Sequence, residues 1–427
     1  MMDQNSKDIK YDAIIIGGGP SGLTAAYFLA NSGYKTILFE RLPKKGILDH
    51  PCGSMICPIW KDITLERTSE GVYFKDVDFL FPNEMIIGSP GRREFTMPNG
   101  VKFGMNLEDP QEHLIFQLNK QKFLRALANR AEGAGANLVY GNTVSELIMK
   151  ENSVSGVKVG DEVFRSSLVL SGEGLSRRFS QQAGLYESEE PHGYIMIYSV
   201  YVKNLNLTDE QLGQVAYFGG KASPVPRSSV TFHSYGKNKG IIFISVLLDE
   251  YEWSHEEPVE KYLNEAVEKI VYLKELTDQG KFYKRDACWI KLATPSRLVS
   301  DGFIAMGDSV APLGHTSNLI AMLTGRKAAE TAIECLSTKD CSLSMLTSYN
   351  KLLESDLFQG VKFEGHLISR LLGFSDEQLN TIGNVLEEAD LSPFFIGSKW
   401  DRLKTSLKLL FNWNAIKNRK LVRKLLG

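Results

Sequence analysis

The sequence predicts an α/β protein that opens with a nucleotide-binding βαβ unit of the Rossmann-like type. The apolar run from Tyr11 to Ile16 predicts a strand, and the segment Gly17-Gly18-Gly19-Pro20-Ser21-Gly22 follows it directly. A second strand is predicted from Lys35 to Phe39. It ends at Glu40, whose carboxylate can accept hydrogen bonds from both ribose hydroxyls of an adenosine. A glycine triplet alone is weak evidence, whereas strand, helix, second strand and acid in register predict a dinucleotide-binding fold.

The residues of the glycine segment have separate roles in such a fold. Gly17 makes the tight turn, Gly19 lets the backbone approach a pyrophosphate, and Gly22 lets the helix pack closely on the strand. The phosphates then lie at the N-terminus of the helix, beside Pro20 and Ser21.

Later segments predict an antiparallel sheet inserted into the nucleotide fold. The stretch 42–108 is too long for a loop and is rich in proline, glycine and aromatic residues. A helix is predicted at 120–133 and another at 258–276, strand then helix returns from Phe303, and the chain beyond Ser344 is expected to be helical. Apolar runs predict strands at 72–74, 79–81, 85–87, 95–103, 137–140, 144–149, 154–159, 163–170, 193–202, 228–235 and 241–248.

These elements divide the chain into three expected regions. A discontinuous nucleotide-binding domain takes 1–60, 118–190 and 285–343, and a substrate-binding β-sheet domain takes 61–117 and 191–284. A helical C-terminal region takes 344–427.

Composition is that of an ordinary globular protein of two or three domains. The 427 residues are 43% hydrophobic and 23% charged with a net charge of −2, which argues against a nucleic-acid partner. No apolar run reaches the roughly 18 residues that a membrane span needs, and the polar N-terminus lacks a signal segment, so we expect a cytoplasmic protein. Five cysteines are too sparse for a disulfide framework, and the histidine spacing predicts no metal site.

The last 29 residues, 399–427, carry nine Lys or Arg side chains against one acid, Asp401. Leu403, Leu407, Leu410 and Phe411 fall on one face of a predicted helix. Such a basic amphipathic helix can lie on an anionic membrane surface. Alternatively, it docks on its own domain with a solvated basic face, and the two interpretations are compatible.

A second segment, Asp301 to Asp308, predicts a short buried strand that ends in Gly307-Asp308. Together with Glu40 it resembles the large FAD-dependent fold of the aromatic hydroxylases, whose Gly-Asp pair binds the flavin ribityl chain. The resemblance implies that two distant segments frame one FAD and that Asp308 holds a ribityl hydroxyl. The alternative is an Asp that caps the next helix.

Within that superfamily, four stretches are similar to the geranylgeranyl reductase family, including the archaeal enzymes that saturate isoprenoid lipid chains. Pro51-Cys52-Gly53 matches a Cys-Gly pair that the family places near the flavin ring. The other three resemble its Leu-Asn-Arg helix, its Ala-Asp-Gly-Ser turn and its final flavin segment; they lie at 116–128, 171–176 and 307–330.

The chain also departs from the family pattern. Gly314-His315-Thr316-Ser317-Asn318 stands where the family has a run of glycines, and Lys120 and Leu124 replace its Arg and Asp. The aromatic Tyr-x-Trp-x-Phe-Pro strand is absent, and the nearest stretch is 229–233.

The resemblance implies two catalytic candidates, Cys52 and His315. The Cys52 thiol would donate a proton or shape the pocket, although a lone cysteine is usually buried filler. His315 would donate a proton or bond the flavin, or have no role at the start of a helix. The residues expected to bind FAD are Gly17, Gly19, Pro20, Ser21, Gly22, Glu40, Arg41, Cys52, Gly53, Lys120, Val144, Gly307, Asp308, Gly314, His315, Thr316 and Ser317.

The implied function is FAD-dependent saturation of carbon-carbon double bonds in geranylgeranyl or other polyprenyl chains of lipids or their precursors. Flavin N5 would supply hydride, and the pocket must be dry because an isolated olefin is a poor hydride acceptor. Aromatic residues at 72–81 and 95–103, with Phe232 and Trp289, could line a tunnel or simply form core. No second glycine-rich fingerprint occurs, so electrons are expected from an external donor such as NAD(P)H or a ferredoxin.

Two other functions stay open at this point. One is an FAD monooxygenase acting on an aromatic or polyketide substrate. The other is a non-redox prenyl-binding or cyclase protein on the same scaffold, which the unusual His315-Thr316-Ser317 stretch keeps in view.

Overall fold

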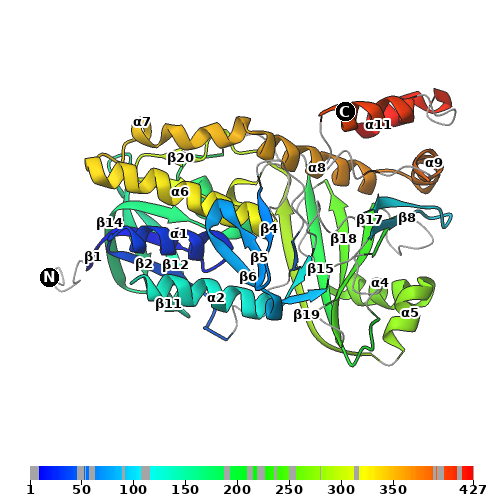
Figure 1. Cartoon of the computed structure of the whole chain (residues 1–427), viewed down its shortest axis with the longest axis horizontal. Helices are drawn as coiled ribbons and strands as arrows, with labels where there is room; N and C mark the ends of the chain where they lie inside the picture. The colour runs from blue at the N-terminus through cyan, green and yellow to red at the C-terminus, as the bar shows by residue number, and fades with distance from the viewer. Residues whose placement is uncertain are drawn as a thin grey trace.

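The computed structural model is built on two large sheets with helices around them (Figure 1). It describes residues 9–45, 52, 54–56, 63–88, 92–106, 116–186, 193–208, 215–218, 227–234, 238–249, 256–278, 280–311, 317–387, 391, 399–410 and 416–426. The first sheet carries the glycine segments and the second carries most of the inserted strands.

The first sheet has eight strands, and its main path runs β11-β2-β1-β14-β13-β12. Strands β11, β2, β1, β14 and β21 are parallel neighbours, whereas β12 and β13 are antiparallel. A parallel strand that is buried on both faces consists of a nearly continuous run of apolar residues. This pattern predicted β1 and β2 from the sequence. The strands are β1 (Ile9–Ile16), β2 (Thr36–Glu40), β11 (Asn137–Tyr140), β12 (Val144–Lys150), β13 (Ser153–Val159), β14 (Glu162–Ser171), β20 (Val299–Ser300) and β21 (Phe303–Ala305).

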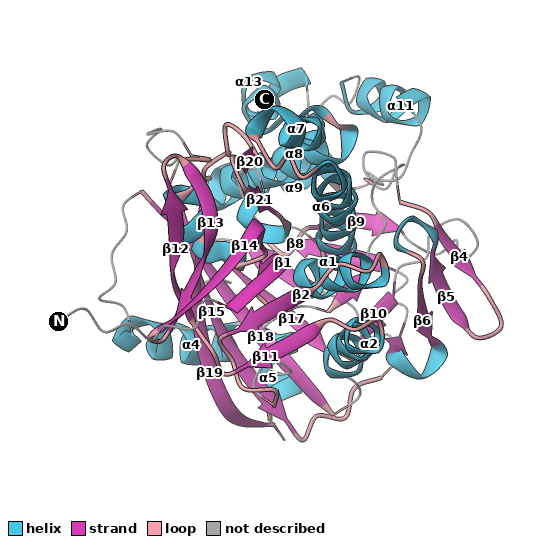
Figure 2. Cartoon of the chain, turned by 90° about the vertical axis from the view of Figure 1, so that its left-hand side faces the viewer, coloured by secondary structure: helices cyan, strands magenta, loops and turns pink. Residues whose placement is uncertain are grey.

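Three helices lie side by side along this sheet: α1 (Pro20–Asn31), α2 (Lys120–Gly133) and α6 (Asn318–Thr338) (Figure 2). Helix α1 packs between the other two. The predicted helix at 120–133 is confirmed by α2. The order of elements and the parallel core confirm the predicted α/β, Rossmann-like class.

The second sheet has seven strands in the order β19-β15-β18-β17-β16-β8-β9. Its pairs are antiparallel except for β16 with β8. One face packs on α4 (Glu256–Lys269) and α5 (Val271–Thr277) through an apolar cluster that includes Val200, Phe232 and Ile244. The strands are β8 (Arg92–Thr96), β9 (Lys102–Asn106), β15 (Tyr194–Lys203), β16 (Val215–Phe218), β17 (Ser228–Ser234), β18 (Lys239–Leu248) and β19 (Lys281–Lys291).

Several predicted elements of this region differ from the structure. The run 95–103 is not one strand, because β8 and β9 form a hairpin around a turn in which Gly100 has φ +87. The helix expected at 258–276 breaks at Ile270, which is extended. Strand β19 was missed and crosses residue 285, where a domain boundary was expected.

Two three-stranded sheets are formed by strands between residues 55 and 118. One contains β4 (Leu65–Arg67), β5 (Gly71–Phe74) and β6 (Phe79–Pro82), and the other contains β3 (Met55–Ile56), β7 (Ile86–Gly88) and β10 (Phe116–Leu118). Phe79 and Phe81 contact the rings of Phe116 and Phe123 in the core of the nucleotide half. These aromatic residues therefore form core, and so does Phe232, which packs against α4 and α5.

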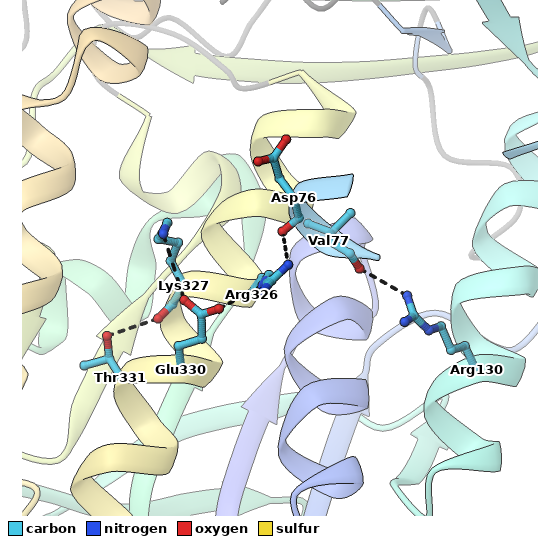
Figure 3. Close-up of polar contacts among 7 residues, drawn as sticks. All are labelled: Asp76, Val77, Arg130, Arg326, Lys327, Glu330 and Thr331. Carbon is cyan, nitrogen blue, oxygen red and sulfur yellow. Dashed lines mark hydrogen bonds and ion pairs between the residues drawn. The ribbon is translucent and has the colours of Figure 1, made fainter. Parts of the chain in front are cut away.

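Two arginines fasten the sheet β4–β6 to the helices (Figure 3). Arg326 of α6 donates to the carbonyl oxygen of Asp76, and Arg130 of α2 donates to that of Val77 at 3.3 Å. Both carbonyls belong to the 3₁₀ turn η2 (Lys75–Val77). The Arg130 guanidinium also lies 3.7 Å from the ring centroid of Tyr27 on α1.

The C-terminal region is helical, as expected, and its parts differ in how they pack. Helices α8 (Asp356–Leu372), α9 (Asp376–Leu386) and α13 (Arg419–Leu426) share an apolar cluster with the end of the second sheet. They are preceded by α7 (Leu343–Leu346) and η7 (Thr347–Glu354). Helix α11 (Lys399–Leu410) lies at the periphery in both views (Figures 1 and 2). Among the described helices, none has the length and apolarity that crossing a bilayer requires.

Candidate functional site

The turn between β1 and α1 is held by backbone contacts that only glycine permits. Gly17 has φ +95, and a Cβ there would lie 2.3 Å from the carbonyl oxygen of Gly172. A Cβ on Gly22 would lie 1.9 Å from the carbonyl oxygen of Gly17. The tight turn and the close helix packing expected of these glycines are therefore both present.

Gly19 is different, because a Cβ at this position would meet nothing within 4 Å. It is the N-cap of α1, and Pro20 is the first residue of that helix. The side-chain position of Gly19 therefore adjoins open space at the N-terminus of α1, where the positive end of the helix dipole suits a pyrophosphate.

The Glu40 carboxylate lies against this turn at the end of β2. Its two oxygens accept hydrogen bonds from the backbone N–H groups of Gly18 at 2.7 Å and Leu42 at 2.8 Å. Each carboxylate oxygen has a second lone pair, so the group can still accept from ribose hydroxyls. Arg41 follows with an exposed side chain.

The second predicted segment meets the first turn of α1 at the side chain of Ser21. Gly307 begins η6 (Gly307–Val310) with φ +66, and a Cβ there would lie 2.6 Å from Ser21 Oγ. A Cβ on Gly325 of α6 would lie 2.2 Å from the Ser21 carbonyl oxygen. The fold thus brings Gly17, Gly172, Gly307 and Gly325 to one point, and Asp308 lies directly beside it.

Asp308 is not the N-cap of the next α-helix. Helix α6 is capped by Ser317, whose hydroxyl accepts from the Ile320 N–H at 3.3 Å. Tyr186 donates to the Ser309 carbonyl at 2.8 Å, and burial raises the pKa of this tyrosine to about 12. A neutral tyrosine therefore holds the turn that contains Asp308.

Cys52 lies where α2 and α6 begin. Its sulfur accepts from the Ser54 N–H at 3.3 Å and from Asn318 Nδ2 at 3.8 Å. Asn318 Oδ1 in turn accepts from the ammonium of Lys120 at 2.5 Å, and both of these side chains are buried. Two predicted residues, Cys52 and Lys120, are thus connected through Asn318, which the sequence singled out only as part of the departure at 314–318.

The remaining predicted residues divide into two groups. Val144 is the buried first residue of β12, two positions after Asn142, whose N–H donates to the Glu40 carbonyl oxygen at 3.0 Å. Gly53, Gly314, His315 and Thr316 lie outside the described residues.

Sequence reasoning missed one buried charge. Arg177 is 1% exposed, and its guanidinium donates to the carbonyl oxygens of Lys291 and Ala293 at 3.0 Å and of Ala311 at 2.8 Å. These contacts connect the end of β19 with the end of η6. No pattern in the sequence distinguishes this arginine from its exposed neighbour Arg178.

The face of the second sheet that is turned away from α4 and α5 carries mixed side chains. Strand pairing places Ser199 beside Phe243 and Asp286, with Thr231 next to Phe243. Cys288 is on the same face, and burial raises the pKa of its thiol to about 12, with smaller effects from the carboxylates of Asp286 and Asp308. The bonds from Arg177 to the carbonyl oxygens of Lys291 and Ala311 place the C-terminal end of β19, and with it this end of the face, near η6.

Comparison with known proteins confirms the resemblance that the sequence motifs indicated. Residues 15–47 match the family described as an NAD(P)-binding Rossmann-like domain. The chain is 25% identical over 419 residues to digeranylgeranylglycerophospholipid reductase 2 of Methanococcoides burtonii, with 95% of each chain covered. It is 24% identical over 376 residues to a probable electron transfer flavoprotein-quinone oxidoreductase of Escherichia coli, with 81% of this chain and 82% of that one covered.

Solved structures share the fold. A geranylgeranyl bacteriochlorophyll reductase-like protein of Thermoplasma acidophilum superimposes with a TM-score of 0.77 at 19% identity, over 97% of this chain and 100% of that one. The halogenase PltM, solved in complex with phloroglucinol and FAD, gives a TM-score of 0.64 at 12% identity, over 97% and 94% of the two chains.

Proposed function

We propose that this protein is an FAD-dependent oxidoreductase that saturates carbon-carbon double bonds of geranylgeranyl or other polyprenyl chains, in lipids or their precursors. The observation that carries the proposal is the similarity to a reductase of digeranylgeranylglycerophospholipids over 95% of both chains. The meeting of the glycine segments at Ser21 supports a dinucleotide cofactor at the same place.

The residues at this place fit FAD. Open space at Gly19 suits the pyrophosphate, Glu40 suits the adenosine ribose, and Asp308 stands beside the junction with the second segment. A halogenase with the same fold was solved with FAD. When bound, the reduced flavin supplies hydride equivalents to the substrate.

The protein's own contribution is position, exclusion of water and a proton. Cys52 is the side chain proposed to provide the proton, because its thiol lies at the start of the two helices that flank the cofactor region. His315 is a second proposed donor. An external NAD(P)H or ferredoxin is proposed to reduce the flavin, because the chain contains one glycine-rich dinucleotide fingerprint.

The test is anaerobic reduction of geranylgeranyl lipids by the purified protein with bound flavin and dithionite as electron source. Mass spectrometry is expected to show successive gains of two hydrogens in the lipid chains. A Gly17→Val variant, which cannot form the cofactor turn, serves as control and is expected to leave the lipids unchanged. Unchanged lipids with a flavin that is fully reduced and reoxidised would reject the substrate and leave the cofactor assignment intact.

A peripheral position on the cytoplasmic face of the membrane is part of the proposal. On α11, Trp400 is 72% exposed, and Leu403 and Leu407 follow it on one helical face. Exposed Lys404 and Lys408 flank this apolar stripe, so the surface complements an anionic bilayer in both charge and polarity.

Binding to vesicles tests this position. The triple variant Trp400→Ala, Leu403→Ala, Leu407→Ala is expected to sediment about tenfold less with vesicles rich in phosphatidylglycerol while its melting temperature is unchanged, because these side chains contact little of the protein. Neutral phosphatidylcholine vesicles provide the charge control. Equal sedimentation of variant and parent would contradict the role of α11.

One observation favours a second candidate, the FAD monooxygenase. Ser199, Thr231 and Asp286 place polar groups among the apolar side chains on the face of the second sheet that is turned away from α4 and α5. Such a face suits a substrate with hydroxyl or carbonyl groups. Oxygen consumption coupled to NAD(P)H oxidation would favour the monooxygenase, and anaerobic lipid saturation would exclude it.

A further inference from the structure

Three polar side chains form a connected row at the junction of α2 and α6. The row runs from the Lys120 ammonium through the Asn318 amide to the Cys52 sulfur, with 2.5 Å from Nζ to Oδ1 and 3.8 Å from Nδ2 to Sγ. Lys120 is 5% exposed and Asn318 is 8% exposed, so these two side chains are shielded from bulk water, whereas Cys52 is partly exposed. Its members come from segments that are 198 and 266 residues apart.

The lysine determines which way the asparagine amide points. An ammonium group can only donate hydrogen bonds, so the amide atom that faces Lys120 must be the oxygen. The NH₂ group of Asn318 is then turned toward Cys52. The orientation of this amide therefore follows from chemistry and does not depend on an arbitrary choice between oxygen and nitrogen.

The Cys52 sulfur receives a second N–H. The backbone N–H of Ser54 donates to it at 3.3 Å, and Ser54 is itself buried. With two donors on the sulfur, the thiol proton is directed elsewhere. The same donors stabilise negative charge on the sulfur after the proton has left, as do Lys120 and the N-termini of α2 and α6.

We propose that Asn318, fixed by Lys120, is a positioning residue that makes Cys52 a proton donor for the reduction. The inference rests on the proposed function and deepens it. The hydride for one olefin carbon would come from a bound, reduced flavin. The S–H bond of Cys52 breaks, and its proton forms a C–H bond at the other carbon. The electron pair stays on sulfur, held by the N–H groups of Ser54 and Asn318, and water returns the proton.

Alkylation of Cys52 in the flavin-loaded protein tests the inference without any substrate. Iodoacetamide is used across a pH series, and the modified Cys52 peptide is quantified by mass spectrometry. The background carries Cys57→Ser, because Cys57 is close in sequence. The other thiols react slowly near neutral pH, because burial raises the pKa of Cys288 and Cys335 to about 12 and of Cys341 to about 11.

The expected result is a lower alkylation rate near neutral pH and a pH profile displaced upward when the row is broken. Asn318→Ala is expected to lower the rate about three- to tenfold, which is the range of one lost hydrogen bond. Asn318→Asp should lower it further, because a carboxylate replaces the N–H donor opposite the sulfur. Lys120→Met should act in the same direction as Asn318→Ala, and Lys120→Arg should restore the parent profile because it still donates to Oδ1.

Asn384→Ala is the control, because Asn384 is exposed on α9 far from the row. Melting temperature and flavin content identify any variant that fails to fold, and Asn318 and Lys120 provide independent substitutions. If Asn318→Ala and Lys120→Met both keep the parent pH profile, the positioning role is wrong. Displaced profiles in a protein that does not reduce polyprenyl lipids would instead reject the proposed substrate and retain the row.

Discussion

The half that carries the glycine segments and the half built on the second sheet differ in which atoms make their close contacts. Around Ser21, backbone meets backbone, and a Cβ on Gly17, Gly22 or Gly325 would lie within 2.3 Å of a carbonyl oxygen. On the face of the second sheet that is turned away from α4 and α5, side chains such as Ser199, Thr231 and Cys288 make the contacts. Backbone contacts restrict a position to glycine, whereas a side-chain surface can change one residue at a time. The cofactor half is therefore the more constrained of the two.

The largest effect is expected from a matched pair of glycine substitutions. Gly17→Ala should lower the free energy of unfolding by about 2–5 kcal/mol, because it combines a strained φ with a clash against Gly172. Gly19→Ala should leave the stability of the cofactor-free protein unchanged, since its Cβ meets nothing within 4 Å. It should instead weaken FAD binding by tenfold or more. Denaturant unfolding and flavin retention measure the two effects, and equal destabilisation by both variants would contradict the contrast.

The connection between the halves provides the next prediction. Arg177→Met removes the guanidinium that satisfies three buried carbonyl oxygens, and about 2–4 kcal/mol of stability should be lost. Arg178→Met, at the exposed neighbouring position, should change stability by less than about 0.5 kcal/mol. Urea unfolding of both variants checks this. Similar values for the two would mean that Arg177 does not connect the halves.

Two buried serines of the second sheet differ in the hydrogen bonding of their hydroxyl groups. Within the described part of the chain, the Ser199 hydroxyl has no hydrogen-bond partner, so Ser199→Ala should raise stability by about 1 kcal/mol. The Ser234 hydroxyl donates to Gln117 Oε1 at 2.5 Å, so Ser234→Ala should lower it by about 1–2 kcal/mol. Thermal unfolding measures whether each variant gains or loses stability. A loss of stability in both variants would show that Ser199 is as well paired as Ser234.

The smallest effect concerns pH at the cofactor half. Burial raises the pKa of Tyr186 from 10.0 to about 12, so its neutral form contributes stability that is complete below about pH 10 and is lost as pH rises through about 12. Tyr186→Phe should cost about 1 kcal/mol at pH 8 through the lost bond to the Ser309 carbonyl. Above pH 10 the parent should lose stability faster than the variant. Parallel curves up to pH 12 would contradict this.

The same contrast explains what the sequence could predict. Strands β1 and β2, helix α2 and the glycine turns followed from apolar runs and from spacing, because a parallel core and a phosphate turn tolerate few alternatives. Strand β19 was missed because charged side chains such as Lys284 and Arg285 interrupt its apolar pattern. The contact of Asn318 with Cys52 joins segments 266 residues apart, and no local pattern encodes it.

The attachment of the sheet β4–β6 to the helices affects which of its residues can be substituted. Arg130 and Arg326 hold the main-chain oxygens of Val77 and Asp76, and almost any amino acid presents such an oxygen (Figure 3). These two bonds place no demand on side chains, so the exposed Lys75 is free to vary, whereas Val77 is buried in the core and the Asp76 carboxylate accepts the Thr64 N–H at 2.6 Å. Exposed residues of the sheet β4–β6 can therefore be substituted, in evolution or by design, while its attachment to α2 and α6 is kept.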